Sequence, residues 1–136
     1  MTATIWAIDD DAASRELLGR VLADRGWKVV PLSDGREALD RLARGARPDA
    51  VVSDIRMAEV GGLEVTEAFR RDAPEVPVIL VTAFGNVDGA VEAIRRGAFD
   101  YVSKPYDVDA VQLTVARALE QRRLAEENRA LRAELR

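Results

Sequence analysis

The sequence contains no cysteine and no histidine, and these two absences exclude several kinds of chemistry. Without cysteine the chain forms no disulfide and binds no metal through thiolates, while the redox compartment stays open. Without histidine it lacks the most common general base, the usual zinc ligand and any internal phosphohistidine relay. Lysine is scarce as well: of the 20 basic residues, only Lys28 and Lys104 are lysine and the others are arginine. A lysine at a special place in such a chain is therefore of interest.

Long hydrophobic runs and an excess of positive charge are also missing. No apolar stretch approaches the roughly 20 residues that span a bilayer, and the first residues lack the basic and apolar regions of a signal peptide. The formal net charge of −4 disfavours a direct contact with nucleic acid. With 136 residues, 48% of them hydrophobic, the chain can form one domain with a core and an appendage. We therefore expect a soluble, cytoplasmic protein with no membrane contact and no direct nucleic-acid contact.

Short β-rich runs alternate with amphipathic helical stretches along the chain. The pattern predicts strands over residues 5–9, 27–32, 50–53, 76–81 and 99–103, and a helix after each of them. The second helix is expected to start at a Ser33 N-cap, and the fourth at Asn86 or Asp88. This alternation predicts an α/β fold with a parallel sheet, and the commonest solution is a flavodoxin-like three-layer sandwich with strand order 2-1-3-4-5.

Acidic residues close two of the predicted strands. Residues 9–11 are all aspartate and follow the first strand, and Asp54 follows the third, which the predicted strand order makes its neighbour. Two carboxylates about 4 Å apart repel by roughly 4 kcal/mol at an effective dielectric of about 20. A hard cation is the simplest remedy, and oxygen ligands of this kind suit Mg²⁺. Thr82 at the end of the fourth strand and Lys104 after the fifth open onto the same edge.

Each of these residues also has an ordinary structural interpretation. Acids at a helix start interact favourably with the helix dipole, which accounts well for Asp11, partly for Asp10, and not for Asp54. Asp54 alone could be a turn residue, Lys104 a solvated surface lysine, and Thr82 a strand residue or a cap. The joint placement of these residues at the ends of separate strands favours a functional site.

Four stretches together resemble the receiver domain of bacterial response regulators. They are Ile8-Asp9-Asp10-Asp11, Ser53-Asp54-Ile55-Arg56-Met57, Val81-Thr82-Ala83 and Tyr101-Val102-Ser103-Lys104-Pro105. Within this family, Ser-Asp-Ile-Arg-Met and the Gly-Ala-Phe-Asp-Tyr run at residues 97–101 are most similar to the NtrC-type branch. The resemblance covers residues 4–120 and implies the flavodoxin-like strand order.

The resemblance implies a role for each site residue. Asp54 is the expected phosphoryl acceptor, holding the group as an acyl phosphate. Asp10 is expected to ligate Mg²⁺ directly, together with Asp54 and the backbone carbonyl of Arg56, while Asp9 assists through water. Lys104 is expected to pair with a phosphoryl oxygen as a compact cation.

The resemblance also implies a switch. Thr82 donates its hydroxyl to the phosphoryl group and moves toward it, and Tyr101 then turns inward, so that the face of the fourth helix and fifth strand repacks. A half-buried aromatic at a sheet edge is the equally open alternative for Tyr101. Gly85 and Gly89 flank the first turn of that helix, and glycine there weakens it by roughly 1 kcal/mol relative to alanine. A loosely held turn suits a two-state element. The Lys104-Pro105 bond resembles the cis peptide of the family.

Two departures from the family pattern fall in the loop after Asp54. Ala58 stands where the family usually has proline, and Gly61-Gly62 where it often has Asp-Gly. Both changes are expected to loosen the loop that carries the Arg56 carbonyl. These departures therefore bear on the rate of phosphorylation and on the affinity for Mg²⁺, and leave the expected phosphoryl-transfer chemistry unchanged.

The last predicted helix continues past the domain. We assign residues 1–119 to the receiver domain and residues 120–136 to a linker helix. Leu124, Asn128, Leu131 and Leu135 occupy the d and a positions of a coiled-coil seam, and asparagine at an a position favours a parallel two-stranded register. A homodimer through this segment is expected, with a single solvated surface helix as the alternative.

We interpret the chain as the regulatory part of a longer regulator. It would accept phosphate from a cognate sensor histidine kinase and control an attached transcription-activating output. NtrC-type regulators continue into an ATPase domain and a DNA-binding domain, and these residues contain no Walker A run. The expected chemistry is limited to self-phosphorylation and self-dephosphorylation, so no enzyme acting on a metabolite is expected.

Two other interpretations compete with this one. A degenerate receiver would serve only as a constitutive dimerisation module, but the intact set of Asp10, Asp54, Thr82 and Lys104 argues against it. A magnesium phosphatase of related α/β form would need a second acid two residues past its nucleophile, where this chain has Arg56.

Overall fold

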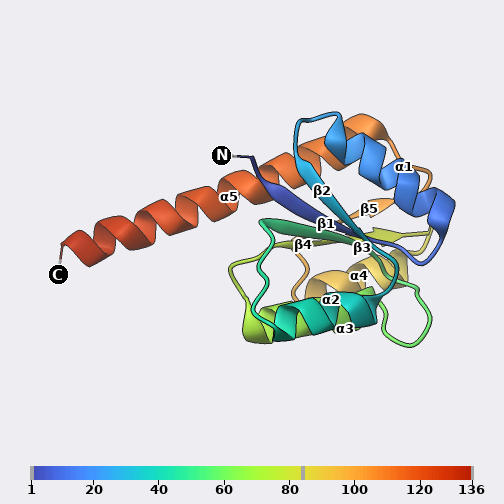
Figure 1. Cartoon of the computed structure of the whole chain (residues 1–136), viewed down its shortest axis with the longest axis horizontal. Helices are drawn as coiled ribbons and strands as arrows, with labels where there is room; N and C mark the ends of the chain where they lie inside the picture. Colours follow the sequence, from blue (N-terminus) through green and yellow to red (C-terminus); the bar gives the residue numbers. More distant parts are fainter. Residues whose placement is uncertain (1, 84, 136) are drawn as a thin grey trace.

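Five parallel strands form one sheet between two layers of helices in the computed structural model, which describes residues 2–83 and 85–135 (Figure 1). Met1, Phe84 and Arg136 lie outside the described residues. The elements in chain order are β1 (Thr4–Ile8), α1 (Ala12–Ala23), β2 (Lys28–Leu32), α2 (Gly35–Ala43), β3 (Ala50–Asp54), α3 (Gly62–Asp72), β4 (Val78–Thr82), α4 (Val87–Arg95), β5 (Asp100–Ser103) and α5 (Val108–Glu134). The strand order is β2-β1-β3-β4-β5, which confirms the predicted fold class and topology.

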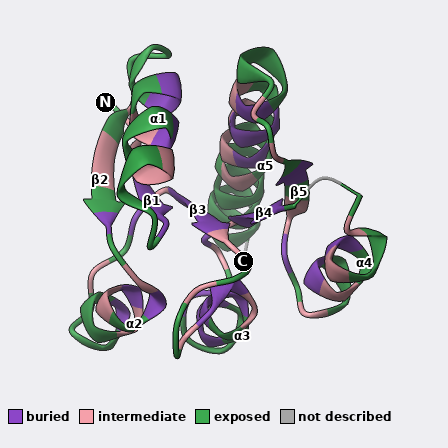
Figure 2. Ribbon diagram, turned by 90° about the vertical axis from the view of Figure 1, so that its right-hand side faces the viewer, coloured by how far each residue is buried: buried purple, intermediate pink, exposed green. Residues whose placement is uncertain are grey.

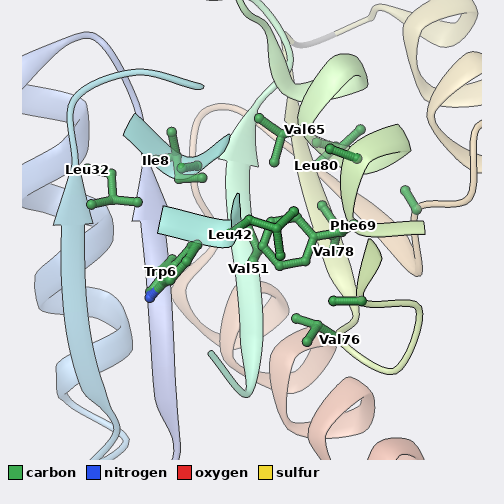
Figure 3. Close-up of a cluster of buried hydrophobic side chains, with 14 of the residues drawn as sticks. Trp6, Ile8, Leu32, Leu42, Val51, Val65, Phe69, Val76, Val78 and Leu80 are labelled. Atoms are coloured by element: carbon green, nitrogen blue, oxygen red, sulfur yellow. The ribbon is translucent and has the colours of Figure 1, made fainter. Parts of the chain in front are cut away.

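The two faces of the sheet are covered by different helices. Figure 2 shows α1 and α5 on one face and α2, α3 and α4 on the other, with the buried residues of each helix turned toward the sheet. The larger core cluster lies under α2 and α3, where the rings of Trp6 and Phe69 meet edge to face at 5.9 Å (Figure 3). Every residue of β4 is buried, as expected for a central parallel strand with both faces covered.

The N-cap of α2 differs from the prediction. Asp34, not Ser33, caps the helix, because its carboxylate accepts a hydrogen bond from the Glu37 N–H at 2.8 Å. The Glu37 side chain reaches back to Ser33 and accepts from its N–H and hydroxyl at 3.3 Å. The two polar residues therefore share the helix start: Asp34 caps the helix, and Ser33, one position earlier, is held by the Glu37 side chain.

The start of α4 is settled in favour of Asn86. Its side chain accepts a hydrogen bond from the Gly89 N–H at 3.0 Å, and a Cβ at Gly89 would lie 2.5 Å from the Asn86 side chain. Gly89 is therefore needed for the cap to fit. The expectation that this turn is loosely held stays a prediction.

The C-terminal helix leaves the body of the domain as one continuous element. Figure 1 shows α5 running from the sheet far beyond it, and the helix spans 27 residues. Leu124, Leu131 and Leu135 along the projecting part are all at least half exposed. Arg122 is the exception on this segment: its side chain is largely buried and donates to the backbone carbonyls of Pro48 and Asp49 at 2.9 and 3.0 Å. Among the described residues, no helix combines the length and the hydrophobicity needed to cross a membrane.

Candidate functional site

The parallel register brings the ends of separate strands to one edge of the sheet. Ile8 of β1 pairs with Ser53 of β3, so the acids that follow these two strands emerge side by side. Thr82 ends β4, and its carbonyl accepts the backbone N–H of Lys104 at 2.8 Å. Residues 9, 54, 82 and 104 thus share the edge predicted for them, because parallel strands end on the same side.

Lys104 is the centre of this edge. Its ammonium lies 2.9 Å from Asp54 Oδ2 and 3.4 Å from Asp9 Oδ2. Asp9 is only 1% exposed and Asp54 16%, so the ammonium is the counter-ion of two carboxylates that are largely withdrawn from water. The peptide bond from Lys104 to Pro105 is cis, as expected. The notion that Lys104 is an ordinary surface lysine is wrong.

The protonation states at this edge follow from burial and pairing. Burial raises the pKa of Asp9, although the Asp11 N–H and the Lys104 ammonium both favour the ionised carboxylate. Burial on its own lowers the pKa of Lys104, but the hydrogen bond and the negative charge of Asp54 outweigh it and raise the pKa above its usual value. The Lys104 ammonium therefore stays charged beside Asp54. A positive charge at this place would allow an anionic group to bind next to the Asp54 carboxylate.

The three consecutive aspartates have three different environments. Asp11 caps α1 by accepting the Ser14 N–H at 2.8 Å, which also lowers the pKa of Asp11, so the ordinary structural interpretation holds for it. Asp9 accepts the Asp11 N–H at 2.9 Å and faces Lys104. Asp10 is exposed, and its Oδ2 lies 3.3 Å from the backbone N–H of Ala58 in the loop after β3.

The donor groups at this edge suit a hard cation. The groups predicted to ligate Mg²⁺ are the carboxylates of Asp10 and Asp54, the carbonyl of Arg56 and, through water, Asp9, and all of these donors are oxygen atoms. Within residues 2–83 and 85–135, no three acidic side chains are grouped closely enough to enclose an ion by themselves. Mg²⁺ usually keeps several waters and binds through one or two carboxylates, so a pair from these residues is sufficient.

Thr82 and Tyr101 lie on the side of the edge that faces α4. Thr82 is buried, and its hydroxyl donates to the Val102 carbonyl at 3.5 Å, a long and weak hydrogen bond. Tyr101 is 41% exposed on β5. Both residues line a groove between α4 and β5, together with Val87, Val91, Ile94 and Ser103.

Sequence reasoning missed three residues at this edge. The guanidinium of Arg15 donates to the Asp9 carbonyl at 2.8 Å, and only its place one turn into α1 hinted at it. The phenol oxygen of Tyr106 is buried with no hydrogen-bond partner among the described residues, and burial raises its pKa to about 12. The contact between the Ala58 N–H and Asp10 was missed as well, although the absence of the family proline at position 58 indicated that a backbone donor is present there.

The sheet has the order 2-1-3-4-5, and one lysine pairs with the carboxylates at its edge. This combination is typical of α/β phospho-acceptor domains, and comparison with known proteins identifies the family. Residues 5–116 match the family model described as the response regulator receiver domain. The chain belongs to this family.

The relatives found are NtrC-type regulators. The chain is 40% identical over 115 residues to the DNA-binding transcriptional regulator NtrC of Escherichia coli K12, covering 85% of this chain and 24% of that protein. It is 44% identical over 131 residues to the C4-dicarboxylate transport transcriptional regulatory protein DctD of Pseudomonas aeruginosa, covering 96% of this chain and 28% of that protein. The chain thus spans about a quarter of the length of these relatives.

Solved structures agree with this placement. The crystal structure of NtrX from Brucella abortus in complex with ATP superposes with a TM-score of 0.89 at 34% identity, covering 96% of this chain and 30% of that one. A response regulator receiver domain protein from Clostridium thermocellum gives a TM-score of 0.84 at 26% identity, covering 90% of this chain and 98% of that one. The second match has the size of an isolated receiver domain.

Proposed function

We propose that this domain is a phosphorylation-dependent switch that accepts a phosphoryl group on Asp54 from a cognate sensor histidine kinase in the cytoplasm. One observation carries the proposal: the Lys104 ammonium lies 2.9 Å from the Asp54 carboxylate and is also paired with Asp9. A permanent cation beside a carboxylate nucleophile lets a dianionic group approach it.

The transfer requires little of the protein beyond charge and position. An Asp54 oxygen attacks phosphorus, the P–N bond to the donor imidazole breaks, and its electron pair returns to the imidazole nitrogen, which takes up a proton from solvent. An ionised carboxylate needs no general base, and this agrees with a chain that has no histidine. The donor histidine therefore lies outside these 136 residues, and we assign it to the sensor kinase.

Mg²⁺ is proposed as the cofactor, held by Asp10, Asp54 and the Arg56 carbonyl, with Asp9 acting through water. When bound, it supplies positive charge that offsets the repulsion between the carboxylates and the phosphoryl oxygens. The protein's own contribution is to hold the donors in place: Arg56 N–H donates to Asp54 Oδ1 at 3.1 Å, and Asp11 N–H fixes Asp9.

The signal is proposed to leave through the groove between α4 and β5. Thr82 gives up its 3.5 Å hydrogen bond to Val102 and turns its hydroxyl toward the phosphoryl group. Space then opens beneath Tyr101, whose half-exposed ring can move into the groove. The exposed apolar face of α4 repacks as a result.

The projecting part of α5 is proposed to join two copies of the chain. Its exposed leucines follow the seam predicted from the sequence, and Asn128 sets a parallel register. A longer regulator would place an ATPase domain and a DNA-binding domain after this helix. The domain itself has a regulatory role and no metabolite substrate. Light scattering over a concentration series tests the dimer, and Leu131→Glu is expected to shift it to monomer.

The phosphorylation proposal is tested by mixing the protein with Mg²⁺ and acetyl phosphate and measuring intact mass. We expect one phosphoryl group on the wild-type protein and none on Asp54→Asn. Uptake that persists in Asp54→Asn would refute the assignment of Asp54. No uptake by the wild type favours a degenerate module, and sustained release of phosphate favours a phosphatase.

A further inference from the structure

The loop between β3 and α3 presents two backbone N–H groups to the acidic edge. Arg56 N–H donates to Asp54 Oδ1 at 3.1 Å, and Ala58 N–H donates to Asp10 Oδ2 at 3.3 Å. The second bond joins residues that are 48 positions apart in the chain. The loop therefore spans both carboxylates that the proposed function assigns to the cation.

Asp10 depends on this bond for its orientation. Its side chain is exposed, and within residues 2–83 and 85–135 it has no other hydrogen bond or ion pair. An unrestrained carboxylate of this kind samples several rotamers, and ordering it on binding costs free energy. A donor that holds it beforehand removes part of that cost.

The backbone that carries the donor is strained. Glu59 follows Ala58 and has a φ of 63°, in the left-handed region that glycine favours. The Val60 N–H donates to the Ala58 carbonyl at 2.8 Å, so residues 58–60 form a γ-turn with positive φ at its centre, which is rare and strained. Strain of this kind persists where the surroundings fix the backbone, and it is concentrated at functional sites.

The surroundings do fix this loop. The Gly62 N–H donates to the Ile55 carbonyl at 2.9 Å and closes the loop on itself. A Cβ at Gly61 would lie 2.6 Å from the Ile55 carbonyl oxygen, and one at Gly62 would lie 2.5 Å from that of Asp54. The glycine pair thus allows the loop to approach the end of β3 closely, while the looser loop expected from the sequence stays a prediction.

We propose that Ala58 is a positioning residue: its N–H presets the Asp10 carboxylate for a divalent cation, and the γ-turn centred on residue 59, which glycine can form without strain, keeps the N–H in place. This inference rests on the proposed function, because it concerns the same site. Proline at position 58 would remove the donor, because proline has no backbone N–H. The residue at position 58 would therefore change the affinity of the site for the cation.

The test is a Mg²⁺ titration of the full chain, followed by heteronuclear NMR of isotope-labelled protein without any phosphoryl donor. Ala58→Pro is expected to weaken Mg²⁺ binding about fivefold, the order of effect for releasing one ordered side chain. Ala58→Gly keeps the N–H and is the matched control, with an affinity close to that of the wild type. Glu59→Gly relieves the positive φ, keeps the donor, and is expected to melt at a higher temperature with unchanged affinity.

A second measurement does not depend on how Ala58→Pro folds. In the wild type the Ala58 amide resonance is expected to shift on adding Mg²⁺ and on the change Asp10→Ala. An Ala58 resonance that responds to neither, or an Ala58→Pro variant that binds Mg²⁺ as tightly as Ala58→Gly, would overturn the inference. Failure of the wild type to bind Mg²⁺ at all would instead refute the proposed cofactor.

Discussion

Arg122 is expected to fix the direction in which the linker helix leaves the domain. Its guanidinium Nη1 donates to the carbonyls of Pro48 and Asp49 at 2.9 and 3.0 Å, and it pairs with the Asp49 and Glu126 carboxylates at 3.6 and 3.0 Å. Only 18% of the side chain is exposed. Arg122→Met keeps the aliphatic stem and removes all of these bonds.

The expected loss of stability follows from the two carbonyl bonds. A hydrogen bond from a charged donor contributes about 1.5–3 kcal/mol, and we discount the pair because water reaches the exposed side of Asp49, which gives a total of about 2 kcal/mol. With a urea slope of about 2 kcal/mol per molar for a domain of this size, the midpoint of unfolding is expected to fall by about 1 M. Circular dichroism and tryptophan fluorescence both report the transition.

The neighbouring residue supplies the control. Arg123 makes as many ion pairs as Arg122, in its case with Glu120 and Glu127, but its side chain is 59% exposed. Exposed pairs add little to stability because water screens them, so Arg123→Met is expected to leave the urea midpoint where it is. Equal shifts for the two variants would refute the argument that burial of the guanidinium is what matters.

The direction of the helix can be measured separately. Because the chain has no cysteine, Arg44→Cys on the domain and Ala133→Cys on α5 give a unique pair of spin-label sites. Electron paramagnetic resonance, with the labelled chain diluted in unlabelled protein, is expected to show one narrow distance distribution. Arg122→Met is expected to broaden it and Arg123→Met to leave it unchanged. A narrow distribution in Arg122→Met would show that the helix keeps its direction without this anchor.

Two further predictions concern residues beside the site. Burial raises the pKa of Tyr106 to about 12 against 10.0 in the unfolded chain, so the folded state keeps the phenol proton longer and stability falls as pH rises through this window. Tyr106→Phe is expected to raise the free energy of unfolding at neutral pH by about 1 kcal/mol, because it removes an unpartnered hydroxyl. It is also expected to reduce the loss of stability at alkaline pH, and a loss as large as that of the wild type would contradict this. Gly62→Ala is expected to lower the free energy of unfolding by about 2 kcal/mol, because its Cβ would meet the Asp54 carbonyl oxygen at 2.5 Å. Gly19→Ala, whose Cβ meets nothing closer than 4.0 Å, is the control in the same urea experiment and is expected to be stabilising.

The sequence predicted the fold because local and global signals agree in it. Apolar runs such as that of β4 lie between helices with one apolar face, and this alternation leaves few topologies. Asp54 and Lys104 could be placed at one edge from topology alone, since parallel strands end on the same side. The errors were of one or two positions, as at the start of β4, predicted at residue 76 and found at Val78, and at Ser33, where two adjacent residues can cap the helix.

The parts of the site that the sequence did not reveal are made by the backbone or by contacts within the folded core. The Ala58 N–H is a donor that every residue except proline provides, so the missing family proline marked position 58, but only the fold shows that the donor reaches Asp10. The burial of the Tyr106 hydroxyl had no signal in the sequence, because it results from packing in the folded domain. The role of Arg122 was hidden among similar arginines of the linker, and only burial separates it from Arg123.

Strands β1 and β3 are held at both ends, whereas the groove between α4 and β5 is lined by exposed apolar side chains. At their amino ends, Thr4 and Asp49 exchange backbone and side-chain hydrogen bonds at 2.7 and 2.8 Å, and Arg122 binds the same segment. At their carboxyl ends, about 17 Å away for strands of this length, Lys104 ties the acids that follow β1 and β3. On the α4 side, Thr82 donates a 3.5 Å hydrogen bond to the Val102 carbonyl, and the apolar side chains of Val87, Val91 and Ile94 are exposed. The helix itself is held by its buried residues Ala90 and Ala93 and by the ion pair between Arg96 and Glu67 at 2.6 Å. We therefore expect a charge added at Asp54 to change the groove between α4 and β5 before it changes β1 and β3, so that the linker helix keeps its direction.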